Sequence, residues 1–292
     1  MKFKLVHTQK HVLAESVTWD SRRGCLFWID IQMASLFTIK PDGLHFRKWS
    51  FSDRICSMGL CCSGRLIIAL AKQVILFDIE EQKSTLLCNI EEDIEYTRLN
   101  DGKVGPDGAF WVGSMDERAN RESVGALYRV TADGDVQPMI EKIKVSNGLA
   151  WSLDTKTMFH ADTGSSWIDR WDFNVDDGSI SNRVRISHSI SDVDGRPDGG
   201  ACDVEGNYWS AGVSGALINC YSREGNLLSS IPVPVSSPTT LCFGGANLDT
   251  MYLTSMTYKQ SEEKLVKYPF TGMLIACDSP VKGVPVTLFD DC

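Results

Sequence analysis

The chain has 292 residues, of which 43% are hydrophobic and 23% are charged, which is typical of a folded globular protein and not of a disordered one. Its 29 basic and 38 acidic side chains give a formal net charge of −9, which disfavours nucleic acid or an anionic membrane surface as a partner. No apolar run approaches the roughly 20 residues that a membrane-spanning helix needs, so no membrane partner is expected.

The ten cysteines are scattered from Cys25 to Cys292 without a C-x-x-C pair, which argues against a zinc-finger site. No Asn-x-Ser/Thr sequon occurs, and residues 1–8 hold too short an apolar run for the core of a signal peptide. We therefore expect reduced thiols and a cytoplasmic location.

Short β-rich runs recur along the chain, each after a turn rich in Gly, Asp or Asn; they cover residues 25–31, 65–70, 110–114, 158–161, 208–211 and 251–254. A second strand-like run follows in each unit, at residues 35–39, 74–79, 126–130, 168–173, 216–221 and 273–277. An apolar anchor precedes each first run; the six anchors are Trp19, Leu60, Val104, Trp151, Cys202 and Phe243. Their spacings of 41, 44, 47, 51 and 41 residues suit one four-stranded propeller blade.

This repeat predicts an all-β fold, a six-bladed β-propeller of four-stranded antiparallel blades around a central metal-containing channel, with residues 1–292 in one domain. A pair of β-sandwiches is the alternative, but it gives no reason for one period to recur six times. Closure of the ring requires the last blade to pair with the start of the chain. We expect residues 1–8 to complete the blade that holds residues 284–289.

Six equivalent positions lie four residues before the anchors: Glu15, Cys56, Asn100, Asn147, Asp198 and Thr239. In a propeller such positions on the innermost strands surround the central channel. Burying two carboxylates together there would be unfavourable unless a cation neutralised them. Oxygen donors favour one divalent ion such as calcium, magnesium or manganese, and zinc remains open. Each Asn-Gly or Asp-Gly step is by itself an ordinary turn signal, so the hypothesis depends on the shared register.

Several segments resemble the family of gluconolactonases, regucalcin (senescence marker protein) and luciferin-regenerating enzyme. They are residues 98–103, 113–115, 145–154, 197–200, 203–209 and 242–245. The resemblance implies a six-bladed propeller whose metal is held by Glu15, Asn147 and Asp198. It also implies that Arg98 and Asn100 contact a sugar lactone, and that either Asp116 or Glu117 contributes an acidic group at the substrate.

The predicted activity is therefore metal-dependent hydrolysis of a sugar lactone to the aldonic acid, with calcium favoured and zinc, manganese, magnesium or iron open. Asp198 is the candidate general base, and Arg98, Asn100 and Glu117 are the candidate substrate-binding residues. The alternatives are a non-catalytic, calcium-binding regulatory propeller and a related hydrolase of phosphotriesters or aryl esters. A serine mechanism is disfavoured because the chain lacks a G-x-S-x-G motif. We expect a monomer or a weak homodimer.

Overall fold

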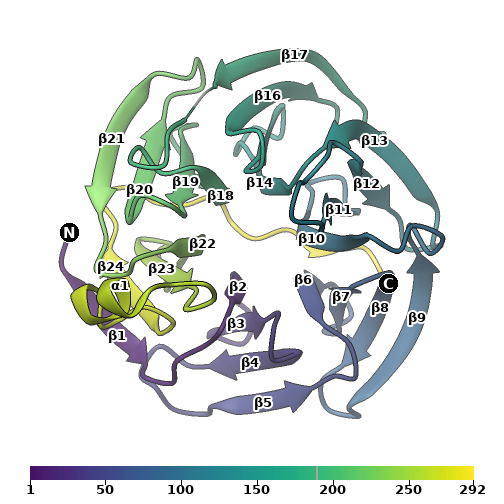
Figure 1. The fold of residues 1–292 in the computed structure, drawn as a ribbon. Coiled ribbons are helices and arrows are strands. Elements are labelled where there is room, and N and C mark those ends of the chain that lie inside the picture. The colour runs from purple at the N-terminus through teal and green to yellow at the C-terminus, as the bar shows by residue number, and fades with distance from the viewer. Residues whose placement is uncertain (189) are drawn as a thin grey trace.

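The computed structural model describes residues 1–188 and 190–292. These residues form six small sheets arranged in a ring, so the predicted six-bladed β-propeller is confirmed (Figure 1). Within each blade, neighbouring strands pair antiparallel. Every predicted anchor lies on an innermost strand, which is why the anchors recur once per blade.

The blades share one order of strands from the axis outward. The innermost strands are β2 (Ala14–Asp20), β6 (Ile55–Cys61), β10 (Thr97–Val104), β14 (Ser146–Trp151), β18 (Pro197–Cys202) and β22 (Pro238–Gly244). The second strands are β3 (Cys25–Asp30), β7 (Leu66–Leu70), β11 (Phe110–Asp116), β15 (Thr157–Asp162), β19 (Tyr208–Gly212) and β23 (Thr250–Ser255). The third strands are β4 (Ser35–Ile39), β8 (Gln73–Asp78), β12 (Gly125–Val130), β16 (Trp167–Phe173), β20 (Leu217–Tyr221) and β24 (Leu274–Asp278). The outermost strands are β5 (Arg47–Ser50), β9 (Lys83–Asn89), β13 (Val136–Ile143), β17 (Ile180–Ser187), β21 (Leu227–Pro232) and β1 (Phe3–His7).

Burial decreases from the axis to the rim of the ring. All seven residues of β6 are buried, whereas β9 in the same blade is exposed over most of its length. The core lies between the faces of adjacent blades, where Phe27 and Leu36 of one blade belong to the same apolar cluster as Ile68 of the next. The crowded axis thus holds each innermost strand on both faces and fixes the side chains that point into the channel.

The ring closes through the start of the chain, as the sequence predicted, because β1 pairs antiparallel with β24. The expectation that residues 284–289 belong to this same blade is wrong. Pro285 interrupts this segment, and its last two residues form β25 (Leu288–Phe289), which pairs instead with β6 in a parallel register.

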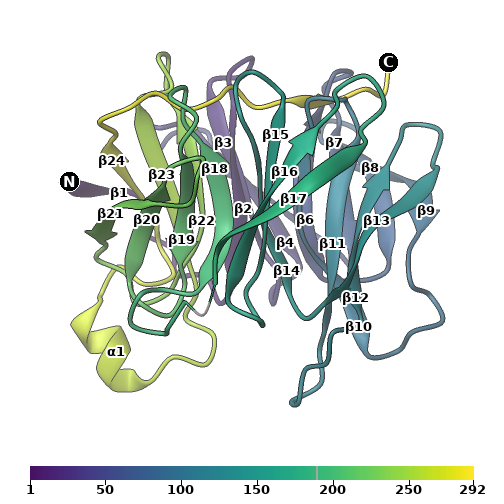
Figure 2. The same ribbon diagram turned by 90° about the horizontal axis from the view of Figure 1, so that it is seen from above.

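Residues 279–292 form a strap that crosses the propeller axis at one end of the molecule (Figures 1 and 2). Asp291 fixes its far end, since the carboxylate accepts hydrogen bonds from the Ser63 amide and hydroxyl and from Arg65 Nε at 3.0, 2.6 and 3.0 Å. The opposite end carries the β11–β12 loop and the helix α1 (Glu262–Lys267). No helix in the described part of the chain is long and apolar enough to cross a membrane.

Candidate functional site

The structure places all six predicted ring positions on the six innermost strands. Every one of these strands has a shift of register at or next to its ring position, for example between Leu99 and Gly102 in β10 and between Pro197 and Gly200 in β18. Such a β-bulge bends the strand and re-aims a side chain. The repeated bulge therefore turns one polar side chain per blade toward the axis. The end of the channel where the innermost strands begin is called the mouth below.

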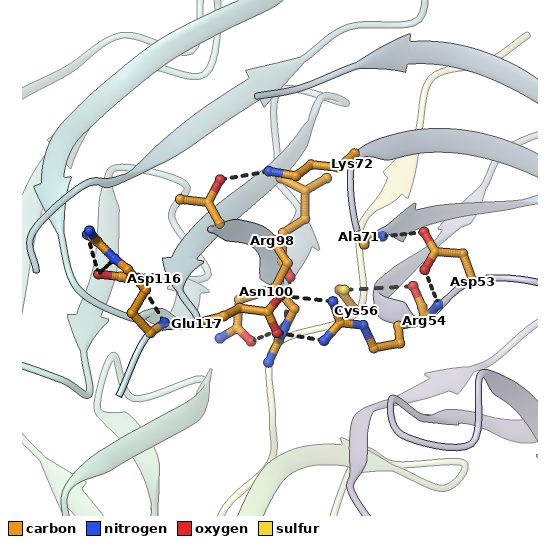
Figure 3. A network of polar contacts seen from close by, with 12 residues as sticks. Asp53, Arg54, Cys56, Ala71, Lys72, Arg98, Asn100, Asp116 and Glu117 are labelled. Carbon is orange, nitrogen blue, oxygen red and sulfur yellow. Dashed lines mark hydrogen bonds and ion pairs between the residues drawn. The ribbon is translucent and has the colours of Figure 1, made fainter. Parts of the chain in front are cut away.

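Asn100 and Asn147 are joined directly at this level. Asn100 Nδ2 donates to Asn147 Oδ1 at 3.2 Å and to the Ser146 carbonyl at 2.9 Å, and Arg98 Nη1 donates to Asn100 Oδ1 at 2.8 Å (Figure 3 shows Arg98 and Asn100). Asn147 Nδ2 in turn donates to Thr163 Oγ1 at 2.7 Å, which leaves its Oδ1 oriented as an acceptor. This buried network fixes the rotamers of two amides and one guanidinium before any ligand binds.

Two acidic ring residues, Glu15 on β2 and Asp198 on β18, are close enough for their charges to interact. Burial raises the pKa of Glu15 to about 8, although a hydrogen bond from Thr240 Oγ1 opposes the shift. Burial likewise raises the pKa of Asp198 well above its usual range, and the negative charges of Glu15 and Asp101 add to this effect. Two carboxylates that resist being charged together make a site that favours a proton or a cation.

Asp101 is a third acidic group here, and the sequence reasoning did not identify it as a site residue. Burial raises its pKa, opposed by the charge of Lys103 and by hydrogen bonds from the amides of Gly148, Leu149 and Gly102. Asp101 is one residue along β10 from Asn100, where the register shifts, and it lines the cavity under the strap together with Lys103. The signal available in the sequence was the Asn-Asp-Gly step itself, which favours irregular backbone.

The structure separates the two acidic candidates that follow β10. Glu117 lies at the mouth, where its carboxylate accepts from Arg54 at 2.6 and 2.9 Å and lies 3.4 Å from Arg98 Nε (Figure 3). Asp116 instead accepts from Arg118 Nε at 2.9 Å and from the Glu122 amide at 2.7 Å, inside its own loop. Glu117, and not Asp116, therefore lies next to the Arg98–Asn100 pair.

The donors in the ring fit a hard divalent cation. Glu15 and Asp198 offer carboxylate oxygens and Asn147 offers an amide oxygen, all of them buried or nearly so. Among the six ring positions, Cys56 offers a sulfur donor and no position holds a histidine. Burial raises the pKa of the Cys56 thiol and so disfavours the thiolate form. Thr239 Oγ1 lies 3.0 Å from Thr254 Oγ1. In the described residues, three acidic or thiol groups within 4.8 Å of one another occur only at Cys62, Asp291 and Cys292, far from the ring.

The chain matches a family model described as SMP-30/Gluconolactonase/LRE-like region over residues 13–257. It belongs to this family. A 6-deoxy-6-sulfogluconolactonase of Pseudomonas putida is 34% identical over 98% of both chains, and a regucalcin of Xenopus laevis is 30% identical over 99% of this chain and 98% of its own. The family assignment thus confirms the resemblance seen in the motifs.

Solved structures agree on the fold of this SMP-30/gluconolactonase family member. A calcium-binding regucalcin from Agrobacterium tumefaciens superposes with a TM-score of 0.91 at 24% identity, covering 98% of this chain and 96% of the other. A luciferin-regenerating enzyme gives a TM-score of 0.89 at 27% identity, covering 98% and 99%. The family and its members indicate sugar-lactone hydrolysis as the general activity, with regucalcins among the relatives.

Proposed function

We propose that this protein hydrolyses a sugar lactone to the aldonic acid with one divalent metal ion held by Glu15, Asn147 and Asp198. The observation that carries the proposal is the convergence of two high-pKa carboxylates and one fixed amide oxygen beside the Arg98–Asn100 pair. The same family includes gluconolactonases by its description, and the Pseudomonas putida relative is a lactonase by its name.

The bound ion would supply Lewis-acid polarisation of the lactone carbonyl and a lowered pKa for water at the site. Asp198 would take the proton from the attacking water, a role that the raised pKa of its carboxyl supports. Arg98 and Asn100 would hold the carbonyl side and a ring hydroxyl of the substrate. Glu117 would keep Arg98 at the mouth, where its carboxylate already contacts that guanidinium.

Calcium is our first choice of metal because the donors are all oxygens, which hard ions prefer. Zinc, manganese, magnesium and ferrous iron accept the same donors and enter the test as alternatives. The ring offers three protein oxygens, so most coordination positions of a calcium ion would be left for water and substrate.

The second candidate function is a non-catalytic, calcium-binding propeller, which the regucalcin relatives bring into consideration. An ion that only links the blades needs ligands but does not need Arg98 and Asn100 at its side. The fixed and buried Arg98–Asn100 pair, which is hydrogen-bonded to Asn147, favours the enzyme.

The experiment is a panel of five- and six-membered sugar lactones, assayed by acid release with each of the five metals after removal of bound ions by a chelator. We expect turnover above the spontaneous rate with at least one metal, lost on chelation and restored on addition of that metal. Metal binding without turnover of any lactone would favour the calcium-binding propeller.

A further inference from the structure

A second set of equivalent positions lies two residues before the ring positions. One member lies inside its innermost strand and each of the other five immediately precedes one, so this set marks the mouth end of the channel. In β10, Arg98 and Asn100 are two residues apart and are joined by a hydrogen bond. The six members are Leu13, Arg54, Arg98, Val145, Arg196 and Ser237. Half of this upper ring is arginine, in a chain whose formal net charge is −9.

Carboxylates balance these arginines only in part. Arg54 and Arg98 share the single carboxylate of Glu117. Arg196 Nε lies 2.8 Å from Asp192 Oδ1, but the Asp192 side chain is 76% exposed. Because exposed ion pairs contribute little, Arg196 can exchange this partner for a ligand at small cost.

A fourth guanidinium comes from the β11–β12 loop. Arg121 Nε donates to the Asp116 carbonyl at 3.1 Å, and no carboxylate of the described residues lies within ion-pair distance of it. Burial, followed by the positive charges of Arg98 and Arg196, lowers the pKa of Arg121. Because Glu117, which contacts Arg98, directly follows Asp116, the hydrogen bond to the Asp116 carbonyl places Arg121 at the mouth as well. An anion bound there would balance positive charge that the existing carboxylates leave uncompensated.

We infer that the substrate of this enzyme carries an anionic group, a phosphate, sulfonate or carboxylate, on the sugar carbon farthest from the lactone carbonyl. The inference rests on the proposed function. With the carbonyl at the level of Asp198, the far end of a six-carbon lactone reaches the upper ring. Arg121 and Arg196 bind the anion there, because a planar guanidinium matches its oxygens with paired donors.

The test compares kcat/KM for 6-phosphogluconolactone and for neutral glucono-1,5-lactone at low salt. We expect at least a tenfold preference for the anionic substrate, decreasing as salt screens the arginines. Arg121→Gln and Arg196→Gln should each lower this ratio by about tenfold, the range for losing a hydrogen bond to a charged group. Sulfonated and carboxylated lactones in the same assay identify the anion.

Arg223→Gln is the matched control, with the same charge change at the opposite end of the blade. Arg223 follows β20, whose last residue Tyr221 pairs with Tyr208 beside Cys202. The ratio of kcat/KM for the anionic lactone to kcat/KM for the neutral lactone should be the same in the Arg223 variant as in the wild type. A wild-type ratio near one, or equal ratios in the Arg196 variant and this control, would overturn the inference while lactonase activity stood.

Failure of the proposed function has a different signature, which is the absence of turnover for neutral and anionic lactones alike. Calorimetry with the product acids then tests the inference independently of turnover. We expect 6-phosphogluconate to bind at least tenfold more tightly than gluconate. Equal binding of the two acids would overturn it.

Discussion

The two ends of the central channel are built from the same six strands and differ in the side chains they present. At the mouth lie the polar ring, the arginines of the upper ring and Glu117. At the other end, a cavity of about 380 Å³ lies among the anchors, including Trp151, Cys202 and Phe243, and is also lined by Asp101 and Lys103. The strap covers it with Val284 and Val286. The start of each innermost strand thus lies at the candidate site, and its end lies at the anchors on which the strap packs.

This difference follows from the contacts that the residues make at each end of the channel. At the strap end, the Val284 amide donates to the Cys202 carbonyl at 3.0 Å, and Phe289 is fully buried against β6. At the mouth, the bulges leave side-chain oxygens directed into the channel, and burial raises the pKa of their carboxylates. A region with unfavourable buried charge and a region with satisfied apolar packing make opposite predictions under mutation.

The largest effect on activity is expected at the acidic ring. Asp198→Asn and Glu15→Gln each remove a charged ligand, so metal affinity and kcat/KM should fall together, the latter by at least about 1,000-fold. Titration calorimetry and the lactone assay measure the two losses. Because the raised pKa values favour the uncharged carboxyl groups when no metal is bound, the neutral amide variants should not have a lower melting temperature without metal. Full activity with either variant would contradict the assigned ligand set.

Asn100→Ala should separate substrate binding from metal binding. Asn100 contacts Arg98 and Asn147 and is not in the proposed ligand set. We expect near-native metal affinity, with kcat/KM lower by about 10 to 1,000-fold, the range for losing an important polar contact in the transition state. A parallel loss of metal would instead assign Asn100 to the ligands.

The strap end should show the reverse behaviour. Phe289→Ala leaves a cavity beside β6 and should lower the free energy of unfolding by about 3 kcal/mol, while kcat/KM of the folded protein stays unchanged. Thermal denaturation and the lactone assay test the two parts. Leu228→Ala, at a half-exposed position on the outer strand β21, is the control and should change neither quantity. Loss of activity in the Phe289 variant would show that the two ends are coupled.

The sequence predicted the repeating part of this molecule and missed its irregular parts. The anchors and the ring were visible because every blade repeats one unit, so Trp19 and Glu15 have counterparts in all the others. Asp101 was missed because it lies one position away from the ring register, outside the set of equivalent residues. Residues 284–289 were assigned to the wrong blade because their apolar pattern fits a strand anywhere. Their actual place depends on covering anchors that are distant in the sequence.

The smallest effect is expected for Glu117→Gln, at the rim of the mouth. Glu117 is one-third exposed and holds Arg54 through two hydrogen bonds while it contacts Arg98 more loosely. Ion pairs at such exposure contribute up to about 1 kcal/mol, so KM should change by no more than about fivefold, with kcat nearly constant. Glu80→Gln, which removes the partner of Arg47 on an outer strand, is the control and should leave KM unchanged.

If Glu117 instead took part in proton transfer, its variant would lower kcat by 100-fold or more at constant KM, since general acid-base catalysis contributes at least about that factor. Comparing the change in KM with the change in kcat therefore decides whether the Glu117 carboxylate positions an arginine or takes part in proton transfer.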